Sequence, residues 1–517
     1  MPKRRRRSAL LAHSITIFQR FAFALNDLQV YCGGQALEKD TWSRPFGVVG
    51  MRKELAPWIV GSLLIGSATA PGQTFKVVHN ISNAETMESV GRLVLSGNTV
   101  YCVGGGYIGG LPHYGSIFRV RTDGSGYAIV KQFPPMYPGS PGGIYTNADG
   151  AVPLGGLVLG GDTLYGTTDQ GGNFGLGTVF SMKMDGNGFV VLKHFSGSDG
   201  SNPHTELTLD GNVLYGTTAG GGVSNKGAIF RVNTDGSNFG LVKSFNGSEG
   251  WGLLGSLTLS DGVLYGTTYR GGAPGFGTVF SINTNGTGFA VLKEFNGVDG
   301  AFPRYNLIVS GGVIYGTTDG GGDGTKSLVY KLNTDGSGFA VLKRFPVPDP
   351  ATGTNDDGFV LRSGLASAGR MLFGSTQQGG HFANGVVFAL HMDDTNYTVL
   401  KQFSANNDPG TNSDGAGPFP SLILSQGTLY GTTESGGSLG GGTLFSIEIA
   451  PRLVPGFSPD GFAFNVIGYP NQQVVIEASG DVGRGSWIPL QTNSVPASFV
   501  DGNWRNYDRR FYRARVQ

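Results

Sequence analysis

The string Leu164-Tyr165-Gly166-Thr167-Thr168 decides the fold, because it returns along the chain at a nearly constant interval. Intact or slightly altered copies stand at 214–218, 264–268, 314–318, 372–376 and 429–433. The first four copies are spaced by 50 residues, and Val100-Tyr101-Cys102-Val103 is a degenerate seventh one. Seven units at such a period indicate one repeat array rather than several unrelated domains.

Composition and charge agree with an array and narrow the class of partner. Glycine supplies 90 of 517 residues and falls at the repeat period, whereas charged residues make up only 14%. Residues 1–53 hold 10 Lys/Arg and 3 Asp/Glu, which leaves 27 against 33, a net charge of −6, for the rest of the chain. The repeats have no Lys/Arg-rich face that could neutralise phosphates, so we expect no nucleic-acid partner.

Each unit contains four short strand-like runs separated by turn signals, as residues 207–245 illustrate. Asp210-Gly211 and Thr234-Asp235-Gly236-Ser237 supply the positive φ of tight hairpins, which predicts a four-stranded antiparallel meander. Runs such as Ala290-Val291-Leu292 place apolar groups on both faces, so each sheet needs a neighbour on each side. We therefore expect an all-β fold, a seven-bladed β-propeller with four-stranded blades over residues 75–450.

The two ends of the array predict how the propeller closes. Residues 75–81 match the fourth-strand pattern of 289–295, yet no first three strands precede them. The seventh unit ends after its third strand, at 444–449. The N-terminal strand can therefore complete the last blade and remove two open sheet edges.

The recurring strings Leu-Tyr-Gly-Thr-Thr, Gly-Thr-Val-Phe and Asp-Gly-x-Gly-Phe-x-Val-Leu-Lys-x-Phe resemble the GloVer tandem repeat of bacterial "choice-of-anchor" proteins. The resemblance covers about residues 75–450, and the first unit departs from it at Cys102-Val103. It implies an exported repeat protein with a variable C-terminal module, and it carries no catalytic residues over to this chain.

The flanks of the array carry three further expectations. Residues 1–50 are interpreted as a non-structural or mis-assigned extension. Residues 51–70, with Met51-Arg52-Lys53 before an apolar stretch and small residues, are typical of a signal peptide, so a secreted or cell-surface protein without a permanent membrane anchor is expected. After the period ends, 455–517 is predicted to form a small β-sandwich module. We expect the protein to be monomeric.

The functional residues are expected on the edge that carries the long connections, such as 169–177 and 197–204, because variable loops on a rigid scaffold usually hold binding sites. The long connections contain aromatic and basic residues suited to stacking on sugars or planar ligands, namely Trp251, Tyr269, Arg270 and Phe276. The acids that follow the paired threonines, Asp169, Asp319 and Glu434, are either part of an acidic rim or solvated loop ends.

Three functions remain open at this stage. The first is a non-enzymatic binding or interaction module for carbohydrate or another cell-surface ligand. The second is a lyase or glycosidase that acts on polysaccharide through carboxylates such as Asp319 and Glu434. The third is a structural surface protein. No catalytic motif is present, the histidines 113, 204 and 381 are not spaced as metal ligands, and no cofactor is expected.

Overall fold

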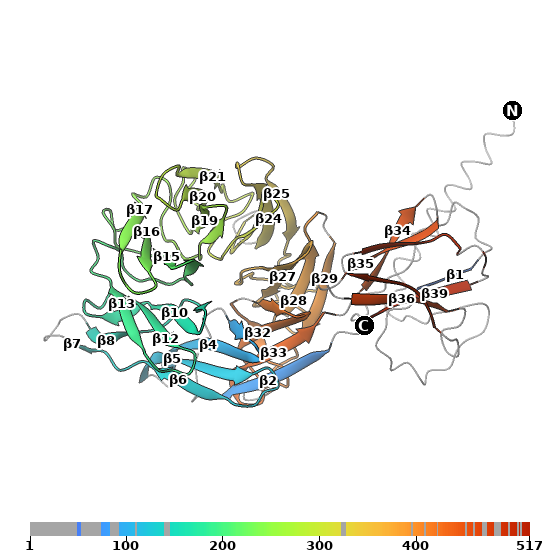
Figure 1. Cartoon of the computed structure of the whole chain (residues 1–517), viewed down its shortest axis with the longest axis horizontal. Helices are drawn as coiled ribbons and strands as arrows, with labels where there is room; N and C mark the ends of the chain where they lie inside the picture. The colour runs from blue at the N-terminus through green and yellow to red at the C-terminus, as the bar shows by residue number, and fades with distance from the viewer. Residues whose placement is uncertain are drawn as a thin grey trace. The chain divides into compact units, whose positions relative to one another are not determined.

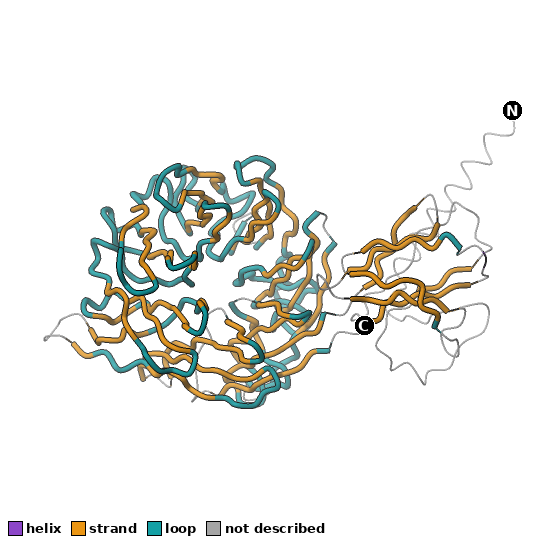
Figure 2. The backbone as a smooth tube through the Cα atoms, viewed as in Figure 1, coloured by secondary structure: helices purple, strands orange, loops and turns teal. Residues whose placement is uncertain are grey.

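The computed structural model describes residues 49–52, 74–82, 93–108, 111–138, 145–321, 327–393, 396–407, 410–420, 422–449, 452–458, 461–467, 473–479, 487–494, 497–503, 506 and 509–516. In these ranges the chain is all-β, without a helix (Figures 1 and 2). It divides into a repeat unit, residues 73–450 with 468–472, and a second unit formed by the remaining residues.

Residues 208–244 show how one repeat folds. Strands β14 (Thr208–Asp210), β15 (Val213–Thr218), β16 (Ala228–Asn233) and β17 (Gly240–Ser244) pair antiparallel in chain order. Gly236 has a φ of 85° in the turn between β16 and β17, a conformation that L-residues with a side chain rarely adopt. The four-stranded meander predicted from the sequence is therefore present, and we call it sheet 3.

Five further sheets of this kind, and one five-stranded sheet, lie in the described part of the repeat unit. Sheet 1 comprises β3 (Val94–Ser96), β4 (Thr99–Ile108), β5 (Leu111–Arg121) and β6 (Ala128–Gln132). Sheet 2 comprises β9 (Val158–Gly160), β10 (Thr163–Thr168), β12 (Thr178–Lys183) and β13 (Val190–His194). Sheet 4 comprises β18 (Thr258–Ser260), β19 (Val263–Thr268), β20 (Thr278–Asn283) and β21 (Ala290–Glu294). Sheet 5 comprises β22 (Ile308–Ser310), β23 (Val313–Thr318), β24 (Leu328–Asn333) and β25 (Ala340–Arg344).

Sheet 6 comprises β26 (Ala366–Ala368), β27 (Met371–Thr376), β28 (Val386–His391) and β29 (Tyr397–Gln402). Sheet 7 joins β30 (Ala416–Pro418), β31 (Ile423–Ser425), β32 (Thr428–Ser435) and β33 (Gly440–Glu448) to β2 (Phe75–Ser82). A small sheet before sheet 2 contains β7 (Tyr137–Pro138), β8 (Tyr145–Ala151) and β11 (Gln170–Gly172). Figure 1 shows the sheets following one another in chain order.

The recurring string explains how neighbouring sheets pack. Leu164 belongs to a buried cluster with sheet 1, whereas Tyr165, on the opposite face of β10, belongs to a cluster with sheet 3. A Cβ atom at Gly166 would lie 2.6 Å from the Phe180 ring, so only glycine leaves room for that ring. Thr167 Oγ1 donates to the carbonyl of Thr205, 3.0 Å away, and thereby ties sheet 2 to the segment that enters sheet 3.

A lysine from the fourth strand makes a second repeated contact between sheets. Lys193 Nζ lies 2.5 Å from Asp199 Oδ2 and 4.3 Å from the centre of the Phe239 ring in the next sheet. Each of the lysines at the equivalent position forms both contacts with its own acid and ring: Lys131, Lys243, Lys293, Lys343 and Lys401. In β2 the equivalent residue is His79, which stacks on Tyr127 of sheet 1 at 4.6 Å.

Strand β2 pairs with β33, as the sequence predicts. The register places Phe75 opposite Ile447 and Val77 opposite Phe445, although the two segments are separated by some 370 residues. Val78 and Ile81 of β2 pack with Val100 and Phe118 of sheet 1. A buried apolar cluster therefore joins sheet 7 to sheet 1, just as others join each described sheet to the next.

The second unit contains two antiparallel sheets. One has the order β34 (Arg452–Ser458), β35 (Gly461–Ile467), β38 (Ala497–Asp501), and the other β1 (Val49–Arg52), β39 (Arg509–Val516), β36 (Gln473–Ser479), β37 (Ile488–Ser494). Val466 and Phe499 of the first share a buried cluster with Ile476 and Tyr512 of the second.

The sequence predicts no strand at β1, and the first strand after the repeats begins at Arg452, before the expected start of the module at 455. Residues 1–48 lie outside the described residues. The same is true of the signal-peptide region after Arg52.

Candidate functional site

The long connections meet at the edge of the sheets opposite the tight hairpins. The segment that enters a sheet pairs through its backbone with the loop between the second and third strands of that sheet. Trp251 N donates to Arg270 O at 2.8 Å, and Arg270 N donates to Trp251 O at 3.1 Å. The same bridge joins Ser201 to Gly220, Ala301 to Gly320 and Phe359 to Gln378. These pairs hold the loop residues on fixed backbone.

An aromatic cluster with a cation lies on these loops in sheets 4 and 5. The Arg270 guanidinium lies 5.9 Å from the Trp251 ring, 5.7 Å from the Tyr269 ring and 5.4 Å from the Phe302 ring. Phe302 also packs on Tyr269 at 5.2 Å and on Phe276 at 5.9 Å. Trp251 keeps 38% of its surface exposed. The structure therefore brings together the four residues that the sequence groups as a ligand-stacking surface, and we call them, with Phe302 and Lys226, the platform.

Lys226 joins the platform from the loop between β15 and β16. Its Nζ lies 5.0 Å from the centre of the Trp251 ring. Contacts of this kind stabilise a cation by about 0.5–1 kcal/mol at exposed sites. Sequence reasoning misses Lys226, because nothing in its own repeat indicates that it reaches the loop of the next sheet.

Phe302 is held in a strained backbone conformation. Its φ is +60°, a value that is uncommon for a residue with a bulky side chain. The equivalent positions of four other repeats, Val152, Asn202, Gly252 and Val360, also have a positive φ, so this conformation is a feature of the repeat. It costs about 1–3 kcal/mol where the residue has a side chain. The backbone N of Phe302 donates to Phe276 O at 2.8 Å, which fixes the ring between Tyr269 and Phe276.

A half-buried ion pair adjoins the platform. Arg304 Nη1 lies 3.4 Å from Asp319 Oδ2, and the Arg304 guanidinium is 5.7 Å from the Tyr269 ring. Asp319 Oδ1 is buried without a hydrogen-bond partner among the described residues, and its side chain is 16% exposed. Burial raises the pKa of Asp319 to about 6, although Arg304 and Arg362 oppose the shift. Burial likewise raises the pKa of Tyr305.

The other two predicted acids contact different partners. Asp169 Oδ1 lies 3.3 Å from His204 Nε2, and this oxygen forms no hydrogen bond to a described residue. Glu434 Oε2 accepts from Gln377 Nε2. Asp169, Asp319 and Glu434 thus each meet a residue of an adjoining segment, and no contact joins them to one another among the described side chains.

No cluster of three or more potential metal ligands occurs among the described residues. His204 contacts Asp169, and His381 Nε2 lies 3.0 Å from Asp356 Oδ1. The side chain of His113 lies outside the described part of the structure. In the described ranges, no helix is long and apolar enough to cross a membrane.

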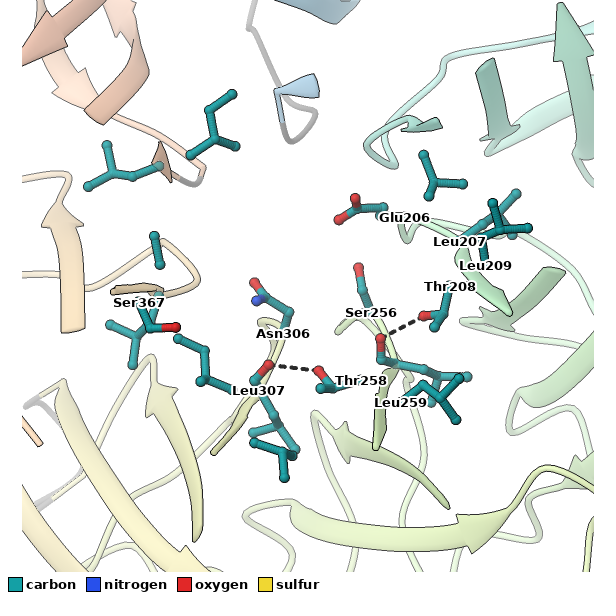
Figure 3. Close-up of a pocket in the computed structure, with 18 of the residues that line it drawn as sticks. Glu206, Leu207, Thr208, Leu209, Ser256, Thr258, Leu259, Asn306, Leu307 and Ser367 are labelled. Atoms are coloured by element: carbon teal, nitrogen blue, oxygen red, sulfur yellow. Dashed lines mark hydrogen bonds between the residues drawn. The ribbon is translucent and has the colours of Figure 1, made fainter. Parts of the chain in front are cut away.

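A cavity of about 530 Å³ lies between the first strands of sheets 2 to 7. Figure 3 shows Glu206, Ser256 and Asn306, which hold equivalent positions in successive repeats, on its wall. Thr208 Oγ1 donates to Leu257 O and Thr258 Oγ1 to Leu307 O, each at 2.7 Å, so these threonines link neighbouring first strands (Figure 3). The sequence does not single out Glu206, Ser256 and Asn306, because they lie just before the short first strands of their repeats and belong to no recognisable motif.

A match to a protein-family model identifies the family of the repeats. The model described as "Gloeobacter/Verrucomicrobia repeat" matches residues 143–326 and 306–454. Together these ranges cover more than half of the 517 residues. The chain belongs to this repeat family. The GloVer resemblance inferred from the recurring strings is thereby confirmed, and no curated protein matches the chain.

Comparison with solved structures returns several remote likenesses. An oligogalacturonate lyase in complex with manganese is 10% identical over 78% of this chain and 96% of its own, with a TM-score of 0.43. A Vibrio parahaemolyticus oligogalacturonate lyase is 8% identical over 79% and 98%, with a TM-score of 0.42. A chain of a nidogen/laminin complex is 18% identical over 48% and 75%, with a TM-score of 0.33. At these scores the likenesses carry no argument about function.

Proposed function

We propose that residues 75–450 form a closed seven-bladed β-propeller whose last blade is completed by β2. The pairing of β2 with β33 and the apolar cluster between sheets 7 and 1 support closure. The stacking of His79 on Tyr127 supports closure as well. This contact between sheets 7 and 1 takes the place of the lysine–ring contact that joins the other pairs of neighbouring sheets. The shared cluster of the second unit supports a β-sandwich.

The propeller is proposed to be a monomeric, non-enzymatic binding module for carbohydrate or another cell-surface ligand. The platform carries this proposal: rigid backbone bridges hold an exposed Trp251 beside Tyr269 and Arg270. Aromatic faces of this kind stack on the apolar face of a sugar ring, and neighbouring polar groups bond its hydroxyls. Many aromatic rings of the repeats are buried between sheets instead, as Phe195 and Phe245 are.

Trp251→Ala and Tyr269→Ala should each weaken binding by about tenfold or more, because hot-spot aromatics commonly contribute upwards of 1–2 kcal/mol. Binding is measured on a glycan array and then by calorimetry with the glycan that responds. The thermal unfolding of Trp251→Ala should stay close to that of the unaltered protein. If stability and binding fall together, the two rings are packing residues and the proposal is wrong.

A polysaccharide lyase or glycosidase is the second candidate. The raised pKa of Asp319 favours it, because a carboxyl group that titrates near pH 6 can donate a proton at neutral pH. Asp319 and Glu434 would both be needed, although each contacts a different neighbour. Release of reducing ends or unsaturated products from a polysaccharide panel, abolished in Asp319→Asn, would establish this candidate. A structural surface role is the third and predicts no glycan binding.

Export is proposed on the residues around Met51, which have the order of a signal peptide. The mature protein isolated from its native cell should begin between about Pro71 and Phe75, because cleavage follows the small residues that precede them. N-terminal sequencing or intact mass measures this directly. A cell-associated form that still carries Arg4 to Arg7 would contradict export from Met51.

A further inference from the structure

The cations of the platform differ from the repeated lysines of the fourth strands in how they are neutralised. The repeated lysines each have a carboxylate close by, as in Lys243 Nζ and Glu249 Oε1 at 2.9 Å. Among the described residues, Lys226 and Arg270 form no ion pair, and both lie over the exposed Trp251. A cation on an aromatic face keeps its remaining N–H donors available to a third partner.

Three acids on the segments around these cations are already engaged. Glu249 pairs with Lys243, and Glu294 Oε1 accepts from the backbone N of Ala273 at 3.2 Å. Asp319 pairs with Arg304, whose guanidinium lies 5.7 Å from the Tyr269 ring. The exposed end of the platform therefore has two positive charges that pair with no described carboxylate, beside the partly exposed indole of Trp251.

We propose that the ligand of the platform is an acidic glycan in which a uronate carboxylate binds between Lys226 and Arg270. This inference rests on the proposed binding function and names its ligand class. The sugar ring of the uronate stacks on Trp251, and the guanidinium of Arg270 offers its paired N–H groups to the carboxylate. A neutral glycan would leave both cations without a counter-charge. The chain beyond residue 53 is otherwise acidic, so this patch also steers the ligand to one place.

The test uses matched pairs of probes and the full chain. Oligosaccharides of mannuronate, galacturonate and glucuronate are compared with the same oligosaccharides after reduction of their carboxyl groups to primary alcohols. At least one acidic member should bind at least tenfold more tightly than its reduced counterpart, and its affinity should fall as salt is added. Lys226→Met and Arg270→Met should each lower the affinity for that acidic probe about tenfold and change the affinity for the reduced probe little.

Lys183→Met is the matched control. Lys183 is an exposed lysine at the hairpin edge, 2.7 Å from Asp162, and its loss removes the same charge far from the loop edge. An equal effect of Lys183→Met would show general charge attraction and overturn the inference.

The remaining outcomes separate the two levels of the proposal. Equal binding of acidic and reduced probes that still depends on Trp251 would overturn the acidic ligand and keep the binding module. No binding to any probe would remove both. Tighter binding of a single-stranded oligonucleotide than of any uronate, again dependent on Trp251, would assign the platform to nucleic acid and overturn the inference.

Discussion

The repeat unit of a chain that begins at Ser82 should aggregate or lose most of its stability, whereas that of a chain that begins at Gln73 should fold normally. The shorter chain lacks Phe75, Val78 and Ile81, and Ile81 is only 1% exposed in the structure. Burial of each such side chain contributes about 1.5–3 kcal/mol, so their loss consumes much of the 5–15 kcal/mol by which a domain is usually stable. It also exposes the edge of β33.

Urea unfolding and light scattering of the two chains measure this effect. A synthetic peptide of residues 73–82, added in trans, should partly restore the stability of the shorter chain, because it can re-form the pairing with β33. A point variant, Ile81→Asp, should reproduce much of the loss within a chain of full length. Identical unfolding curves for the two chains would show that β2 behaves as an ordinary tail.

The second large effect concerns pH. The pKa of Asp319 is raised from 3.8 to about 6, so the folded state holds this proton more tightly than the unfolded state does. The contribution of Asp319 to the free energy of unfolding is therefore fully present below about pH 4. It is lost as the pH rises from about 4 through 6, because the unfolded state releases the proton first. A shift of about two units corresponds to roughly 3 kcal/mol. An asparagine amide cannot ionise, so relative to the unaltered protein, Asp319→Asn should gain about that amount between pH 4 and pH 7.5.

Urea unfolding of both proteins at a series of pH values tests this expectation. Asp335→Asn is a suitable control, because Asp335 lies in an exposed turn and hydrogen bonds from Ser337 lower its pKa. Its contribution is lost only as pH falls below the usual range of an aspartate, so Asp335→Asn should show no change between pH 4 and pH 7.5. Parallel curves for Asp319→Asn and the unaltered protein would show that folding leaves the pKa of Asp319 unshifted, and would contradict the expectation.

Most of the fold could be predicted from local patterns in the sequence. Period, alternation and the Asp-Gly turns predict the strands of a repeat, since these depend on neighbours within a few residues. The pairing of β2 with β33 is also readable, because the orphan strand 75–81 matches the strand that the seventh unit lacks. Strand β1 is not readable, because its four residues pair with β39 far along the chain and carry no turn signal.

The site divides in the same way. Sequence alone placed Trp251, Tyr269, Arg270 and Phe276 on one edge, because a meander puts alternate connections on the same side. Only the tertiary structure decided that Lys226 reaches Trp251, that Arg304 lies between Tyr269 and Asp319, and that burial raises the pKa of that carboxyl. The contacts that set charge and burial join different repeats, and the repeat period shows that two sheets are neighbours without showing which of their side chains meet.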